Sequence, residues 1–285
     1  MLRARQLLLL SLLAAFSTMA LKTLAWYLTG SVGYLSDAIE SLVNVAGAGF
    51  ALWMVTLAQR PADDGHPFGH SKAEYFSAAF EGGMILLAAI AIFISAGERL
   101  LNPQPVAALA LGTVFTVIAS LINLTMAILL LRGGKRHNSP ALEGDGKHLM
   151  TDVWTTAGVV IGVAAASLSG LNWLDPLVAI AVALHILHEG AGILQRAING
   201  LMDPALPNDR IAEIEQCLTT VGGSEVRFSQ LRTRSAATLQ FAQVNMLVPA
   251  HWRVDQAHQL ADDAEDALAQ LGVELIVHIE PKPLP

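Results

Sequence analysis

Long apolar runs separated by short polar stretches dominate about the first 200 residues. A helix needs about 20 mostly apolar residues to cross a membrane, and six runs reach that length. The predicted spans are Gln6–Tyr27, Val32–Leu57, Ala73–Ala96, Val106–Leu131, Leu142–Leu168 and Leu174–Leu194. The pattern predicts a membrane α-helical bundle of six transmembrane helices, which form a transmembrane domain over residues 1–203.

The pattern changes after Asp203-Pro204 to the short elements of a small soluble domain. We expect the elements Pro207–Thr220 (helix), Glu225–Thr233 (strand), Thr238–Val248 (strand), Val254–Leu271 (helix) and Val273–Ile279 (strand). The order αββαβ predicts a two-layer α+β sandwich over residues 204–285, with its helices on one face of a small sheet. The other sheet face would then be free for pairing, so we expect a homodimer.

Basic residues lie almost entirely on one side of the predicted membrane topology. That side carries Arg3, Arg5, Arg60, Lys72, Arg132, Lys135, Arg136, Lys147 and Arg196. The opposite loops carry only Arg99, at the end of a helix. Because basic loops stay in the cytoplasm, the pattern predicts a multi-pass protein of the cell inner membrane with both termini cytoplasmic.

Composition narrows the function classes. The chain is 53% hydrophobic and 14% charged, against about 25% charged in soluble domains. The net charge of −7 argues against a nucleic-acid partner and leaves membrane lipid as the surrounding medium. The single cysteine, Cys217, excludes an intramolecular disulfide. Neither an HExxH motif nor a Ser/His/Asp arrangement stands out, so we do not expect an enzyme.

Two polar pairs interrupt the apolar runs. Glu40 and Asn44 lie in the second predicted span, and His148 and Asp152 lie near the start of the fifth. Spacing of i, i+4 puts each pair on one helix face. Ionisable groups in lipid are costly unless they are paired or reach water. Four N and O ligands suit a divalent transition metal. The alternative is an interhelical hydrogen-bond cluster, which two carboxylates and a histidine make too costly.

The third predicted span begins with a polar stretch that places Glu74 and Glu81 near or inside it. The loop before that span contains Asp63, His66 and His70 among glycines and prolines, which could wrap one cation or form a solvated polar loop.

Histidines and acidic residues also recur in the predicted soluble domain. His258 precedes Asp262 by one helical turn, and His278 and Glu280 share one face of the last strand. A metal could lie between helix and strand, or these could be surface histidines.

Three segments together resemble the cation diffusion facilitators, especially the bacterial zinc and iron efflux members. They are AWYLTGSVGYLSDAIESLVN, PADDGHPFGHSKAEYFSA and KHLMTDVWTT. The resemblance implies a dimeric six-helix antiporter that exports a divalent cation, zinc or iron or else manganese, cobalt or cadmium, from the cytoplasm in exchange for protons. It implies a transport site on the second and fifth helices at Glu40, Asn44, His148 and Asp152. A loop site would map to Asp63, His66 and His70, and a tail site to His258, His278 and Glu280.

The chain departs from this family at two sites. Members usually carry aspartates where this chain has Glu40 and Asn44, so the site loses one negative charge and changes shape. Ser229 and Asn245 stand where relatives have tail histidines. These departures leave the metal open. They also favour an alternative function, a transport-deficient metal sensor or scaffold of the same fold.

Overall fold

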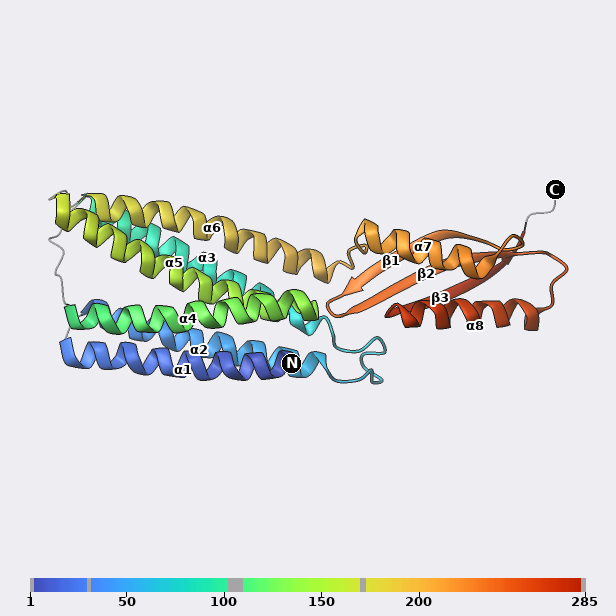
Figure 1. The fold of residues 1–285 in the computed structure, drawn as a ribbon, viewed down its shortest axis with the longest axis horizontal. Helices are drawn as coiled ribbons and strands as arrows, with labels where there is room; N and C mark the ends of the chain where they lie inside the picture. Colours follow the sequence, from blue (N-terminus) through green and yellow to red (C-terminus); the bar gives the residue numbers. More distant parts are fainter. Residues whose placement is uncertain (1–2, 30–31, 102–109, 170–172, 283–285) are drawn as a thin grey trace. The chain divides into compact units, whose positions relative to one another are not determined.

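The computed structural model describes residues 3–29, 32–101, 110–169 and 173–282. The chain divides into two compact units, Met1–Ile198 and Asn199–Pro285. Figure 1 shows long helices side by side in the first unit, and a small sheet with helices in the second.

Each apolar run of the first unit forms one long helix. The helices are α1 (Ala4–Thr29), α2 (Val32–Ala58), α3 (Ala73–Leu101), α4 (Ala110–His137), α5 (Pro140–Ser169) and α6 (Leu174–Leu201). The predicted start of the fourth span at Val106 lies outside the described residues. Several helices continue beyond the predicted apolar limits by a turn or more, because helical backbone bonding does not require an apolar side chain at its ends.

Four of these helices, within the part of the chain described, contain a stretch long and apolar enough to cross a membrane. The stretches are Ala4–Leu24, Ala73–Glu98, Val114–His137 and Pro176–Leu201. In α2, only the shorter stretch Asn44–Ala58 is identified as apolar. The first half of α5 carries charged residues such as Asp145 and Lys147. Among the described residues of α2 and α5, the two helices that carry the polar pairs, no stretch of spanning length is identified.

Two hydrophobic clusters hold the first unit together. One joins α1, α2, α4 and α5 through fully buried side chains that include Leu8, Val55, Leu130 and Leu142. The other joins α3 to α6 and centres on Ile85. Burial of a leucine or isoleucine side chain is worth about 1.5–3 kcal/mol relative to exposure in water, an upper guide inside lipid.

Glycines let α5 approach two other helices closely. A Cβ atom added to Gly144 would lie 3.2 Å from the Cα atom of Ala78 in α3. A Cβ atom added to Gly146 would lie 3.0 Å from the backbone nitrogen of Leu131 in α4. Both distances are tighter than ordinary van der Waals contact, so these positions need glycine. The backbone of α5 therefore lies close to both α3 and α4.

The second unit contains two helices and three strands. Its elements are α7 (Asn208–Gly222), β1 (Arg227–Ala236), β2 (Leu239–Val248), α8 (Val254–Gln270) and β3 (Val273–Pro281). The turn predicted over Ser235–Ala237 is shorter in the structure, because Ala236 pairs with Leu239. The reversal therefore falls on Ala237, which has φ 53°, and on Thr238.

The sheet has the order β1-β2-β3, antiparallel between β1 and β2 and parallel between β2 and β3. Val244 of β2 is buried against α7 and α8, and Met246 of β2 is buried against α8. Ile276 of β3 points to the other face and is half exposed. Both helices thus cover one face, giving the two-layer arrangement that the element order predicts.

Candidate metal centre

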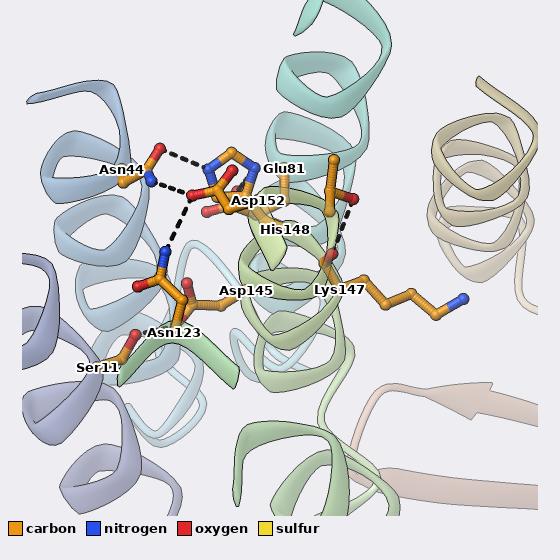
Figure 2. A network of polar contacts seen from close by, with 9 residues as sticks. Ser11, Asn44, Glu81, Asn123, Asp145, Lys147, His148 and Asp152 are labelled. Carbon is orange, nitrogen blue, oxygen red and sulfur yellow. Dashed lines mark hydrogen bonds and ion pairs between the residues drawn. The ribbon is translucent and has the colours of Figure 1, made fainter. Parts of the chain in front are cut away.

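Three of the four side chains predicted for the intramembrane site meet between α2 and α5 (Figure 2). The Nε2 atom of His148 lies 2.9 Å from Oδ1 of Asn44, whose Nδ2 donates a hydrogen bond to Oδ2 of Asp152. All three side chains are buried. Glu40 lies in α2 one turn before Asn44, but its side chain is outside the described part of the structure. Helical spacing on two packed helices is therefore enough to bring the site together.

A third helix contributes an amide that the sequence pattern did not single out. Asn123 of α4 is buried, and its Nδ2 lies 3.4 Å from Oδ2 of Asp152. One oxygen of Asp152 thus receives two amide donors, Asn44 and Asn123, which stabilise its negative charge.

Two more carboxylates lie beside these residues, each about 1% exposed. Asp145 of α5 accepts a hydrogen bond of 2.7 Å from the hydroxyl of Ser11 in α1. Glu81 of α3 places Oε2 3.9 Å from Nδ1 of His148. The cluster therefore draws residues from α1, α2, α3, α4 and α5, and Figure 2 shows its labelled side chains close together.

This cluster is rich in buried carboxyl groups. Its described members include three buried carboxylates, Glu81, Asp145 and Asp152, and among described residues no lysine or arginine forms an ion pair with any of them. Lys147 points away and pairs instead with Glu189 of α6 at 2.7 Å. Buried carboxylates without compensating cations are costly, so this arrangement favours binding of a positive ion.

The sequence held a signal for one of the added residues. Asp145 precedes His148 by three positions, which places it on the same face of α5. Glu81 stands out only as a charge within an apolar span, and nothing in the pattern connects it to His148. Asn123 is a single amide in an apolar helix and gives no signal for the site.

The loop after α2 brings its three predicted ligands together. The ligand atoms of Asp63, His66 and His70 all lie within 4.8 Å of one another, the only such group of three acidic, histidine or cysteine residues among those described. Oδ1 of Asp63 lies 3.3 Å from Nδ1 of His66, and Oδ2 lies 3.4 Å from Nε2 of His70.

A short turn sets this geometry. The backbones of Asp63 and His66 exchange hydrogen bonds, and Gly69 adopts φ +79°, which glycine allows without strain. Hydrogen bonds from the backbone N–H of His66, above all, lower the pKa of the Asp63 carboxyl below its ordinary value. The carboxylate is exposed and stays charged wherever histidine titrates, which suits it to hold a cation.

The predicted tail ligands do not form one cluster. Oε1 of Glu280 lies 3.5 Å from Nε2 of His278 and also accepts a hydrogen bond of 2.9 Å from Asn245. His258 instead lies 3.5 Å from Asp262 on α8. The sheet explains this separation, because β3 turns its alternate residues toward α8 and leaves His278 and Glu280 on the open face.

Two family models match the chain and together extend over nearly its whole length. Residues 8–202 match the cation efflux transmembrane domain, and residues 206–282 match the cytoplasmic domain of cation efflux proteins. An uncharacterized transporter of Synechocystis sp., sll1263, is 47% identical over 280 residues, which cover 98% of this chain and 90% of that protein.

Other relatives are more distant. The cation-efflux pump FieF of Klebsiella pneumoniae is 30% identical over 271 residues, which cover 94% of this chain and 89% of the pump. A solved chain of CzrB is 30% identical over 27% of this chain and 99% of its own, with a TM-score of 0.27.

Proposed function

The chain belongs to the cation efflux family of multi-pass membrane transporters, and from this premise we propose that it is a proton-coupled antiporter that exports divalent transition-metal cations from the cytoplasm. The transport domain is residues 1–203, whose six helices all cross the inner membrane. Residues 204–285 form a cytoplasmic domain that pairs in a homodimer. The excess of basic residues on one side of the helices supports cytoplasmic positions for both termini.

The charge of the buried cluster carries this proposal. Glu81, Asp145 and Asp152 are buried beside one imidazole, and none pairs with a lysine or arginine of the described chain. An interhelical hydrogen-bond cluster would need only neutral groups. A transported dication would give these buried carboxyl groups the positive partner that they lack.

The mechanism is ligand exchange. A hydrated cation enters from the cytoplasm and exchanges water for oxygen and nitrogen ligands from Glu40, Asn44, His148 and Asp152. Imidazole and carboxylate must lose protons to bind a metal, so cation binding and proton binding compete at the same groups. Rocking of the helices then opens the site to the outside, where protonation releases the cation.

The loop trio of Asp63, His66 and His70 acts as a first cation acceptor on the cytoplasmic side. Its exposure suits rapid exchange with solvent. The tail residues His258, His278 and Glu280 remain candidates for metal ligands at the dimer interface, where a second copy could complete a partial set.

Zinc and iron are the first cargo candidates. The site keeps a nitrogen ligand, which zinc, iron and cobalt accept readily. Asn44 supplies a neutral oxygen where the family places a carboxylate, so manganese, cobalt and cadmium also need testing. A transport-deficient sensor or scaffold is the second candidate, because Asn44 and the separated tail residues depart from the transporting members.

Reconstituted vesicles test the proposal. Purified protein in vesicles containing a pH-sensitive dye and a metal indicator is given zinc, iron(II), manganese, cobalt or cadmium outside. We expect metal uptake to be accompanied by release of protons from the vesicle. Collapse of the proton gradient should abolish uptake against a metal gradient. Metal binding without uptake of any of these ions would show the sensor or scaffold function instead.

A further inference from the structure

We propose that Glu81 of α3 is a fifth residue of the transport site, one that supplies the negative charge missing at Asn44 and holds the imidazole of His148 from its Nδ1 side. This inference rests on the proposed transport function. It makes α3 a determinant of which cation is carried, in addition to α2 and α5.

The burial of Glu81 is the first observation. Its side chain is 1% exposed, and within the described residues neither carboxylate oxygen has a hydrogen-bond partner. A buried carboxylate that served only to pack α3 would be replaced at lower cost by an apolar side chain or would be given donors. Both oxygens of this carboxylate are therefore available to a positive group, such as a transported cation, that binds and leaves.

The neighbouring helices leave room for this one side chain. A Cβ atom at Gly47 of α2 would lie 2.8 Å from Oε1 of Glu81, closer than real contacts allow. A Cβ atom at Gly144 of α5 would lie 3.4 Å from Cβ of Glu81. Glycine on both flanking helices therefore lets Glu81 reach inward between them.

The two edges of the His148 ring face different partners. Nε2 lies 2.9 Å from Oδ1 of Asn44, and Nδ1 lies 3.9 Å from Oε2 of Glu81. A carboxylate beside one ring nitrogen of a metal-binding histidine fixes the ring and its tautomer and leaves the other nitrogen for the metal. Glu81 lies on the Nδ1 side of the ring, opposite the Nε2 side where Asn44 supplies an oxygen, and a shift of less than 1 Å would bring it to hydrogen-bond distance.

Glu74 provides a matched control on the same helix. It lies two turns before Glu81 and is buried as well, but its carboxylate accepts a hydrogen bond from the hydroxyl of Ser139. Glu74→Gln removes a buried charge from α3 outside the cluster of Asn44, His148 and Asp152, whereas Glu81→Gln removes one beside it.

The test compares transport by the full-length wild type, Glu74→Gln, Glu81→Gln and the double variant Glu81→Gln with Asn44→Asp. Initial rates of zinc and manganese uptake are measured over a range of concentrations. A lost charge next to a dication is expected to raise the half-saturating concentration about tenfold in Glu81→Gln, with the maximal rate within about twofold. Asn44→Asp returns the missing charge and brings half-saturation back to within about threefold of wild type.

Selectivity distinguishes a site residue from a packing residue. Glu81→Gln is expected to change the ratio of zinc to manganese uptake, and Glu74→Gln to leave it unchanged. Equal ratios and half-saturation in wild type and Glu81→Gln, or a defect that Asn44→Asp leaves in place, would overturn the inference about Glu81. A wild type that carries none of the tested metals would instead overturn the transport function, so the two failures are distinct.

Discussion

The two clusters that we propose to bind cations differ in how they are built. The helical cluster around His148 and Asp152 is buried and joins residues far apart in the chain. The loop trio of Asp63, His66 and His70 comes from eight consecutive residues, with Asp63 and His66 exposed. The first depends on the packing of whole helices, and the second depends on one turn.

This difference changes what each cluster can do. Buried carboxylates lose the favourable interactions with water and need a positive partner to replace them. A cation bound there is therefore contacted by protein groups on most sides. Exposed groups keep water as a competitor and bind a cation weakly but quickly. A transporter needs both properties, fast capture at the surface and selective binding within the membrane.

Loss of a buried ligand should have the largest effect. We expect His148→Ala and Asp152→Ala each to lower the initial rate of zinc uptake by about a hundredfold or more, because even residues that only support a metal ligand contribute 10–100-fold. Vesicle uptake with size-exclusion chromatography of the purified variants measures this. Thr155→Ala removes a hydroxyl bonded to the backbone of Asp152 at 2.9 Å and should remain near wild type. Uptake that persists in both alanine variants would exclude this cluster as the transport site.

The loop trio should respond to pH through its histidines. The pKa of Asp63 is lowered, so its carboxylate remains charged as the pH falls from 7.5 to 5.5, while histidine generally protonates near pH 6.5. Cation affinity should therefore drop about tenfold or more over that range, and the stabilising effect of the Asp63 charge is lost only below the ordinary aspartate pKa.

Calorimetry with zinc on full-length Asp152→Ala protein measures the loop affinity without the helical site. His66→Ala with His70→Ala in the same background should abolish the pH-dependent part. An unchanged affinity from pH 7.5 to 5.5 would contradict the role of the imidazoles.

Added volume beside Glu81 should disturb the helical cluster without removing a ligand. We expect Gly47→Ala to lower uptake about fivefold, because the added Cβ atom would push the carboxylate end of Glu81 away from its position beside His148. Gly49→Ala is the matched control, since a Cβ atom there meets nothing within 4 Å. The comparison needs only rates of zinc uptake and thermal stability, and equal rates in both variants would mean that the cluster tolerates displacement of Glu81.

Loss of the loop trio should have the smallest effect on transport. Asp63→Ala, His66→Ala and His70→Ala together are expected to lower uptake by about twofold at saturating zinc and more at low zinc, because exposed pairs contribute little. A loss as complete as that of Asp152→Ala would remove the distinction between the capture site and the transport site.

The helices and the pair of His148 and Asp152 could be predicted from the sequence because both follow from spacing along one chain. The apolar runs locate α1–α6, and i, i+4 spacing puts His148 on the same face as Asp152. The loop trio could be predicted equally well, since its three residues are close in sequence. Local rules suffice for every feature of this kind.

The rest of the cluster depends on contacts between helices. Glu81 reaches His148 only because α3 packs on α5 at Gly144, and the sequence does not encode that pairing in any period. Asn123 likewise reaches Asp152 through the packing of α4. In the second unit, the order of the elements was enough to predict the two layers. The separation of His258 from His278 could not be predicted, because it depends on which face of the sheet the side chains of β3 point to.

Helix α5 meets the backbone of α3 at Gly144 and the backbone of α4 at Gly146, where it has no side chain of its own. Interlocked side chains resist sliding because each must leave its groove before the helices can shift, whereas smooth contacts let one helix shear along another by small steps. His148 and Asp152 lie one and two helical turns after Gly144. A displacement of α5 along α3 and α4 would therefore move His148 and Asp152 together, while Asn44 would stay with α2.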